Sequence, residues 1–500
     1  MQRTYVESAE DQKVVDWLAP PDPWSKHADA RARHEDGTGQ WLLASDEYLE
    51  WKALQNRILW LHGKPGCGKT VLCSSIVEDL RALCKKSSSI QLAAFYFSFS
   101  DTRKQSYVEM LASLIVQLRR NERTAARLQQ GWQQVYPSRP PQGLLEEIFQ
   151  ITVQQYGRVM LVLDALDEVP NDGDNRHSVL MWLRDTLRTQ PNVQFFLTSR
   201  QIPDLHSAFA ELKAPEITVS STLANEDIDK YVNAEMFKDK RLRSLECDLK
   251  AKILSSFRQK ADGMFRWAYC QMEELKRLKI WRPKYIKQVI NAFPRGLDAT
   301  YERKLQQIDD MYREETYKAL RWLAFETRPI TMLELSEACL IDIDGEGRVD
   351  VDNRGSIAGI LELLADFVIV ETAWMNEHGR VYGSHQISEE DDNYEEMTNL
   401  MKVPVYNSHE IVDRNRVRLA HFSVKEYLIS PRIKHGKAAA FWMDEKREAN
   451  ILAQSCAAYL LHLSRTVQRP LRWIHNDSIE FPFVRYAGFA WPLYARRSVP

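Results

Sequence analysis

The sequence lacks any long apolar run. Stretches such as Leu92–Phe97 and Val159–Leu163 are far shorter than the roughly 20 residues that a membrane-spanning helix needs. The first residues, Met1–Tyr5, lead into charged residues and not into the apolar core of a signal peptide. We therefore expect neither a membrane span nor secretion.

The sequence also lacks an excess of charge of one sign, and it lacks closely spaced pairs of cysteines. Lys and Arg number 67 against 69 Asp and Glu, which gives a net charge of −2. A nucleic-acid binder usually carries a basic surplus or stripe, so no nucleic-acid partner is expected. The seven cysteines show no C-x-x-C spacing, which argues against a zinc site and a disulfide framework. A cytoplasmic location fits best.

Ordinary globular composition is present instead, with 44% hydrophobic and 27% charged residues. Five hundred residues exceed one hydrophobic core, so roughly two to four domains are expected. Short apolar strands alternate with helices such as Thr70–Leu83 and Val108–Arg119, which predicts a parallel sheet with crossover helices. The predicted strands are Ile58–Leu61, Leu92–Ser98, Val159–Leu163 and Val193–Thr198.

Helical periodicity dominates after about Thr222, and a predicted strand at Val417–Phe422 suggests a winged-helix-like unit. The acidic stretch 375–410 is interpreted as a surface loop, with a binding tail as the alternative. The fold class is therefore α/β: a P-loop NTPase parallel-sheet core, then an all-helical domain and a winged-helix-like domain. The expected divisions are leader helices (1–50), the NTPase core (51–222), a helical domain (223–310), the winged-helix-like domain (311–435) and a C-terminal helical segment (436–500).

The octet Gly63–Thr70 matches G-x-x-x-x-G-K-[ST], with an apolar strand before it and an amphipathic helix after it. Its glycines let the backbone form a nest of N–H donors around phosphates, and the helix adds the positive end of its dipole. Lys69 is expected on the β- and γ-phosphates and Thr70 on Mg²⁺. The expected nucleotide-binding residues here are Gly63, Lys64, Pro65, Gly66, Cys67, Gly68, Lys69, Thr70 and Val71.

Acidic residues follow the strand Val159–Leu163. Asp164 at its carboxyl end is expected to hold Mg²⁺, directly or through water. Asp167 or Glu168 would orient or deprotonate the attacking water, unless both merely cap the next element. Arg200 follows the strand end Thr198-Ser199 and would approach the γ-phosphate, because the two-pronged guanidinium group stabilises charge spread over phosphate oxygens. The alternative is that Arg200 is a plain surface residue.

Together these motifs resemble NACHT domains, which are STAND-class P-loop NTPases. The match is closest to the fungal NACHT proteins that carry ankyrin or WD repeats. Further resemblance lies in Gly37–Leu43, Lys104–Ser106, Ala261–Phe265, Phe293–Leu297, Leu419–Leu428, Tyr486-Ala487 and Trp491-Pro492.

The resemblance implies a switch in which a bound diphosphate holds a closed state and exchange for triphosphate permits oligomerisation. It also implies that His421 contacts the β-phosphate, whereas a His beside Phe-Ser is otherwise more often a packed structural residue. Phe265 stands where many relatives have Pro near the adenine, so ATP/ADP and GTP/GDP both stay open. No Asn-Lys-x-Asp motif follows Asp164, which favours ATP.

Three functions compete. The first is a signalling switch that binds and slowly hydrolyses a nucleoside triphosphate and associates with itself when active. The second is a scaffold whose nucleotide is never cleaved. A metabolic P-loop kinase is the third, but residues 201–220 offer no Arg cluster for a lid.

Overall fold

The structure is a computed structural model in two compact units, residues 1–296 and 297–500. It describes residues 9–53, 57–119, 122–171, 174–343, 348–350, 353–355, 357–371, 374–375, 381–382, 415–466 and 481–498. Each unit is considered by itself below. No helix in these residues is long and apolar enough to cross a membrane.

The first unit is built on a five-stranded parallel sheet with the order β2-β3-β4-β1-β5. Short apolar strands pair in parallel because the helices that follow them return the chain across a face of the sheet. This α/β core confirms the predicted fold class. The strands are β1 (Ile58–Gly63), β2 (Ile90–Tyr96), β3 (Arg158–Asp164), β4 (Val193–Ser199) and β5 (Glu216–Val219).

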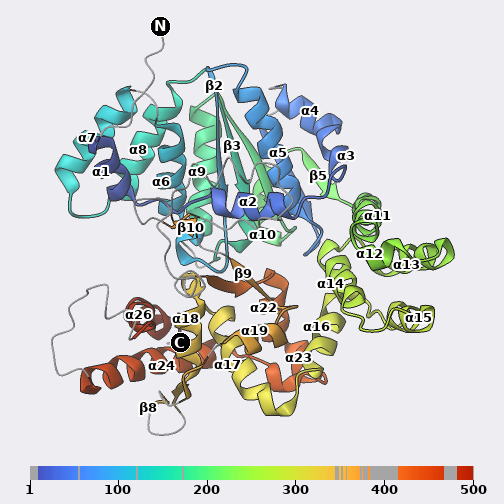
Figure 1. The fold of residues 1–500 in the computed structure, drawn as a ribbon. Helices are drawn as coiled ribbons and strands as arrows, with labels where there is room; N and C mark the ends of the chain where they lie inside the picture. The colour runs from blue at the N-terminus through green and yellow to red at the C-terminus, as the bar shows by residue number, and fades with distance from the viewer. Residues whose placement is uncertain are drawn as a thin grey trace, which may run out of the picture. The chain divides into compact units, whose positions relative to one another are not determined.

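Alternate strand residues enter two separate apolar cores, because side chains of a strand point to opposite faces. On β3, Leu161 joins one core and Val162 the other. Figure 1 shows helices α1, α6, α7, α8 and α9 on one side of the strands and α3, α4 and α5 on the other. Their bounds are α1 (Ala9–Leu18), α3 (Gln40–Leu43), α4 (Asp46–Lys52), α5 (Lys69–Cys84), α6 (Tyr107–Leu118), α7 (Glu122–Val135), α8 (Gln142–Val153) and α9 (Asn175–Thr189).

Shorter elements complete the core. They are α2 (Trp24–Ala32), the 3₁₀ turns η1 (Thr102–Gln105) and η2 (Leu166–Glu168), and α10 (Pro203–Glu211). Of these, α2 precedes the first strand in sequence, and the others each follow the carboxyl end of a strand. Strand β5, which the sequence did not predict, has the pattern exposed-buried-exposed-buried and pairs on one side with β1. An edge strand of four residues buries too little apolar surface to give a clear sequence signal.

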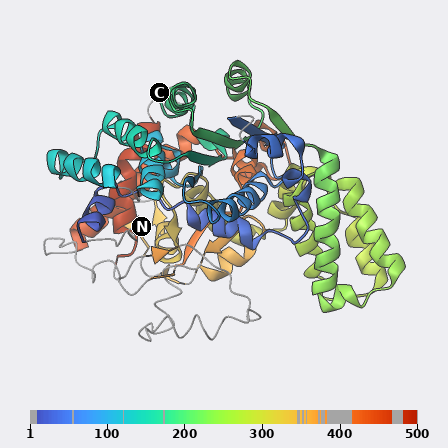
Figure 2. The ribbon, with the colours of Figure 1, turned by 90° about the horizontal axis from the view of Figure 1, so that it is seen from above.

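A helical part follows β5 within the same unit, and Figure 2 shows its green helices side by side. Its buried Asp227 accepts hydrogen bonds from the Gly39 backbone N–H (2.8 Å) and the Trp41 indole N–H (2.9 Å). The leader segment is therefore tied directly to the helical part. The helices are α11 (Ser221–Lys238), α12 (Lys240–Arg243), α13 (Cys247–Lys260), α14 (Phe265–Lys276) and α15 (Pro283–Asn291).

The second unit combines helices with small antiparallel sheets, the largest with the order β6-β12-β9. Its helices are α16 (Gly296–Gln306), α17 (Arg313–Ala324), α18 (Met332–Cys339), α19 (Ala358–Leu363), α22 (Phe422–Ile429), α23 (Pro431–Lys434), α24 (Glu445–Thr466) and α26 (Val484–Ser498), with 3₁₀ turns η3 (Asp310–Tyr312) and η5 (Ala439–Phe441). Its strands are β6 (Ile330–Thr331), β7 (Ile341–Asp342), β8 (Arg348–Val349), β9 (Val368–Glu371), β10 (Trp374–Met375), β11 (Val381–Tyr382) and β12 (Arg416–Leu419).

Two sequence predictions in this unit need comment. The predicted strand Val417–Phe422 ends at Leu419, because His421 caps a helix that begins at Phe422. The predicted acidic insertion, residues 375–410, lies outside the described residues except for Met375 and residues 381–382.

Candidate nucleotide-binding site

The loop between β1 and α5 carries the P-loop octet. Gly66 and Gly68 have positive φ values of 73° and 93°, a conformation that residues with a side chain rarely adopt. Gly68 is the N-cap of α5, so Lys69, Thr70 and Val71 form the first turn of the helix. Their backbone N–H groups lack partners within the helix, which makes this terminus suited to an anion.

Close packing beneath the loop fixes its curvature. A Cβ added at Gly63 would lie 2.9 Å from the Cys67 sulfur and 3.0 Å from the Val219 Cβ. Cys67 itself is buried in the core beneath α5. The Lys69 ammonium donates to the carbonyls of Gly63 (2.9 Å) and Lys64 (3.1 Å), so its charge lies over the loop. The octet thus forms a compact cradle with a cation at its rim.

Asp164 is the last residue of β3, which is separated from β1 by the single strand β4. Its side chain is buried, with the residue 1% exposed. One carboxylate oxygen accepts from the Thr70 hydroxyl (2.8 Å) and the other from the Thr198 hydroxyl (2.6 Å). Burial raises the pKa of Asp164, and these two hydrogen bonds oppose that rise. The structure therefore brings together Thr70 and Asp164, the two residues that the sequence predicted as metal ligands.

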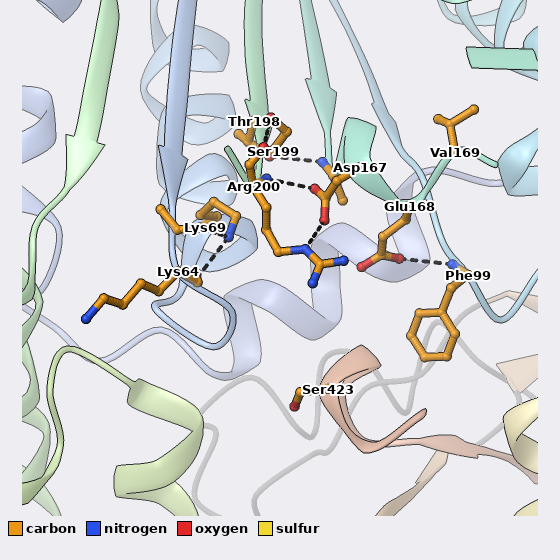
Figure 3. Close-up of polar contacts among 12 residues, drawn as sticks. Lys64, Lys69, Phe99, Asp167, Glu168, Val169, Thr198, Ser199, Arg200 and Ser423 are labelled. Carbon is orange, nitrogen blue, oxygen red and sulfur yellow. Dashed lines mark hydrogen bonds and ion pairs between the residues drawn. The ribbon is translucent and has the colours of Figure 1, made fainter. Parts of the chain in front are cut away.

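Asp167 and Arg200 form an ion pair beside this carboxylate. The Arg200 Nε donates to one Asp167 oxygen (2.6 Å) and the Arg200 backbone N–H to the other (3.0 Å). Figure 3 shows the pair between the P-loop and Glu168. With both oxygens engaged by Arg200, Asp167 is placed to hold the arginine and is poorly placed to take a proton from water.

Glu168 has a different environment. One of its carboxylate oxygens accepts from the Phe99 backbone N–H (2.9 Å), as Figure 3 shows. Burial raises the pKa of Glu168 to about 7, a value suited to a general base at neutral pH. The two acids that the sequence left as alternatives therefore differ: Asp167 pairs with Arg200, and Glu168 has the raised pKa.

The helical part of the first unit contacts the P-loop at three points. Lys64 pairs with Asp262 (2.8 Å), and the Arg266 backbone N–H donates to the Gly66 carbonyl (3.1 Å). A Cβ added at Gly68 would lie 3.6 Å from the Phe265 ring. The segment Asp262–Arg266 thus lies directly against the phosphate cradle.

The oxygen atoms at this site fit Mg²⁺. Mg²⁺ commonly uses one or two carboxylates, waters and substrate phosphates, and it needs no dedicated cage of protein ligands. A hydroxyl and a buried carboxylate 2.8 Å apart, at the mouth of a phosphate cradle, supply that donor set. Within the described residues no cluster of three or more His, Cys, Asp or Glu offers an alternative metal site.

His421 lies in the second unit, at the N-cap of α22. Its Nδ1 accepts from the Ser423 backbone N–H (3.1 Å) and hydrogen-bonds with the Ser423 hydroxyl (2.7 Å). The contact between His421 and a nucleotide stays a prediction.

Sequence reasoning missed two contributors. Thr198 was treated only as part of the strand leading to Arg200, although its hydroxyl binds Asp164 and accepts from the Ala165 backbone N–H (2.9 Å). The available signal was a polar residue directly after the apolar run Phe195–Leu197 of β4. The backbone of Phe99 was missed because a main-chain donor leaves no mark in a sequence.

The sequence is similar to known proteins. Residues 37–200 match the family described as Nephrocystin 3, N-terminal. The Vegetative incompatibility protein HET-E-1 of Podospora anserina is 28% identical over 346 residues, which are 66% of this chain and 24% of that protein. The Azaphilone pigments biosynthesis cluster protein L of Monascus ruber is 28% identical over 204 residues, 40% of this chain and 35% of that protein.

A solved structure, the Walker-type ATPase PABY2304 of Pyrococcus abyssi, aligns with 68% of this chain and 93% of its own. At 14% identity and a TM-score of 0.30, this similarity does not support a fold assignment. The fold class is based on the parallel sheet of the structure itself. The chain covers only a quarter to a third of its two curated relatives. The family match and the two fungal relatives together support the resemblance to NACHT-type, fungal NLR-like proteins that the sequence motifs indicate.

Proposed function

We propose that this chain is a nucleotide-dependent signalling switch. It binds ATP or GTP with Mg²⁺, hydrolyses it slowly, and changes its conformation and self-association with the nucleotide state. The observation that carries the proposal is the contact between Thr70 and Asp164, 2.8 Å apart beside the P-loop cradle. A hydroxyl from the helix and a buried carboxylate from β3 meet there because two loops converge at the same edge of the sheet.

Each residue of the site has a defined task in this function. The backbone N–H groups of the P-loop and the Lys69 ammonium bind the phosphates, and Thr70 and Asp164 would hold Mg²⁺. The ion, when bound, neutralises phosphate charge. Glu168 accepts the proton of the attacking water, and Asp167 aims Arg200 at charge that develops during transfer.

Coupling between nucleotide and conformation runs through the segment Asp262–Arg266. Its contacts with Lys64 and Gly66 are made to the same loop that binds the phosphates. A ligand shifts a conformational equilibrium only when it contacts the two states differently. A loop whose backbone binds both the phosphates and the helical part provides that difference.

The wider setting follows from the relatives. One of them is named for vegetative incompatibility, which supports a place in recognition signalling. A cytoplasmic location is part of the same proposal. We extend the same proposal to self-association on activation and to a winged-helix-like domain within the second unit.

The test is to purify the full chain and identify the copurifying nucleotide by chromatography. Bound ADP or GDP is expected, because the product holds the closed state. In Lys69→Ala the bound nucleotide should be lost, while Lys86→Ala, at the far end of α5, should keep it. Unchanged occupancy in Lys69→Ala would defeat the site assignment. Nucleotide that is bound but never cleaved would instead support the scaffold function.

A further inference from the structure

The loop that follows β2 contacts Glu168 through its backbone. Phe99 donates its N–H to one Glu168 carboxylate oxygen (2.9 Å), and Figure 3 shows this contact. The residues on either side of Phe99, Ser98 and Ser100, are buried, and their hydroxyls hydrogen-bond to each other (3.0 Å). The backbone donor that meets Glu168 therefore belongs to a packed part of the loop.

Gln105, the last residue of η1, contacts the same loop with its side chain. Its amide NH₂ group donates to the Ser98 carbonyl (3.1 Å) and to the Phe99 carbonyl (2.7 Å). A glutamine side chain carries two N–H donors, so one group can serve both carbonyls. The Ser98 backbone N–H donates in turn to the Lys104 carbonyl (3.2 Å). Gln105 thus holds the peptide groups on both sides of Phe99.

The hydrogen bond from Gln105 to the Ser98 carbonyl sets the direction of the Phe99 N–H. These two backbone groups belong to one peptide unit, which is planar, and in a trans unit the C=O and the N–H point in opposite directions. Gln105 binds the C=O of this unit, and Glu168 binds its N–H. The peptide unit cannot rotate away from Glu168 without breaking its hydrogen bond to Gln105.

We propose that Gln105 is a positioning residue for nucleotide hydrolysis, which fixes the peptide unit between Ser98 and Phe99 so that the Phe99 N–H holds the Glu168 carboxylate towards the attacking water. This inference rests on the proposed function, in which Glu168 is the general base. A base must lie within hydrogen-bond reach of the proton that it takes. A carboxylate that turns freely spends less time in that orientation, so hydrolysis slows while nucleotide binding is kept.

The test separates the hydrolysis step from nucleotide binding. The full chain is stripped of nucleotide, single-turnover hydrolysis of ATP and of GTP is measured with Mg²⁺, and calorimetry gives Kd for ADP and GDP. Q105M keeps the unbranched shape of the side chain and removes both donors, so hydrolysis should slow by about tenfold or more with unchanged diphosphate affinities. Q117M is the matched control, because Gln117 donates to the Ala94 carbonyl of β2 (2.9 Å), and it should hydrolyse at the wild-type rate.

The pH dependence of hydrolysis distinguishes positioning of Glu168 from a purely structural role of Gln105. Burial is the largest influence on the pKa of Glu168 and raises it, whereas the Phe99 N–H lowers it because the hydrogen bond favours the ionised carboxylate. The charged side chains that also act on this carboxyl are those of Lys26, Asp167 and Asp164. Losing the hydrogen bond raises the pKa, so the rise of the hydrolysis rate should move to higher pH in Q105M and stay in place in Q117M.

The outcomes separate this inference from the function on which it rests. A wild-type chain that binds no nucleotide, or never cleaves it, refutes the proposed function itself. If the wild type hydrolyses its nucleotide, then an unchanged rate in Q105M, an equal loss in Q117M, or a slower rate without the shift in pH overturns the role of Gln105 alone. Q105L also lacks both donors and replaces Q105M if that variant does not fold. Loss of nucleotide binding in both variants also overturns the inference, because Gln105 would then support the fold and not the base.

Discussion

Replacing Thr198 by Val tests whether the Asp164 carboxylate depends on its buried partner. Valine keeps the shape of the side chain and removes the hydroxyl, which is fully buried at this position. Two hydrogen bonds disappear, one donated to the Asp164 carboxylate (2.6 Å) and one accepted from the Ala165 backbone N–H (2.9 Å). A hydrogen bond to a charged group contributes about 2 kcal/mol and a stranded buried donor costs about 1 kcal/mol, so the loss should be about 3 kcal/mol.

The loss should also depend on pH, with a sign that the structure fixes. Burial raises the folded-state pKa of Asp164 above its unfolded value of about 3.9, so ionisation weakens the folded state as pH rises above that value. The Thr198 hydrogen bond offsets part of this cost. Removing it therefore costs more when Asp164 is ionised than when it is protonated, so the loss should grow as the pH rises.

The assay is urea unfolding of the full chain, followed by circular dichroism at neutral and acidic pH. Thr152→Val is the matched control, because its hydroxyl is equally buried but bonds only to the Ile148 carbonyl (2.6 Å) and to Thr124 (3.1 Å). The control should lose about 2 kcal/mol at either pH, about 1 for a neutral hydrogen bond and about 1 for the Thr124 hydroxyl that loses its acceptor. Equal losses in the two variants, or a loss in Thr198→Val that does not grow with pH, would refute the reasoning.

Three further predictions concern other groups. The rate of hydrolysis by the wild-type chain should rise as the pH passes through about 7, which is the pKa of Glu168. Glu168→Gln should keep nucleotide binding, hydrolyse the nucleotide more slowly and lack that rise. Phosphate-release rates measured across this pH range check both expectations. Arg200→Lys keeps the charge but loses the fork that Asp167 orients, so single-turnover hydrolysis should slow by about tenfold or more without loss of diphosphate affinity. Glu448→Gln removes a fully buried charge that pairs with two arginines and should cost about 3 kcal/mol in urea unfolding. The exposed Glu314→Gln should cost no more than about 0.5 kcal/mol.

Sequence reasoning found the strand, loop and helix of the P-loop octet, for physical reasons. The P-loop needs its glycines and Lys69 in one continuous run, and a buried strand that ends in Asp164 has a recognisable pattern. Four of the five strands of the sheet were predicted within a few residues. These features are local in sequence, so periodicity and spacing suffice to find them.

Contributions that depend on tertiary contacts could not be read in this way. The choice between Asp167 and Glu168 depends on which carboxylate Arg200 engages, and the sequence places both acids equally. Strand β5 was missed because its edge position leaves half of its residues exposed.

The buried Asp227 on α11 has a consequence for how this chain can be divided. Its carboxylate is satisfied by the Gly39 backbone and the Trp41 indole, both from the leader, and by Lys230 (2.9 Å) on its own helix. A fragment that starts at residue 51 would strand a 2% exposed anion and lose helix α2 with it. The leader and the helical part should therefore resist proteolysis together, and a single cut between Gly39 and the P-loop should loosen α11 before it loosens the sheet.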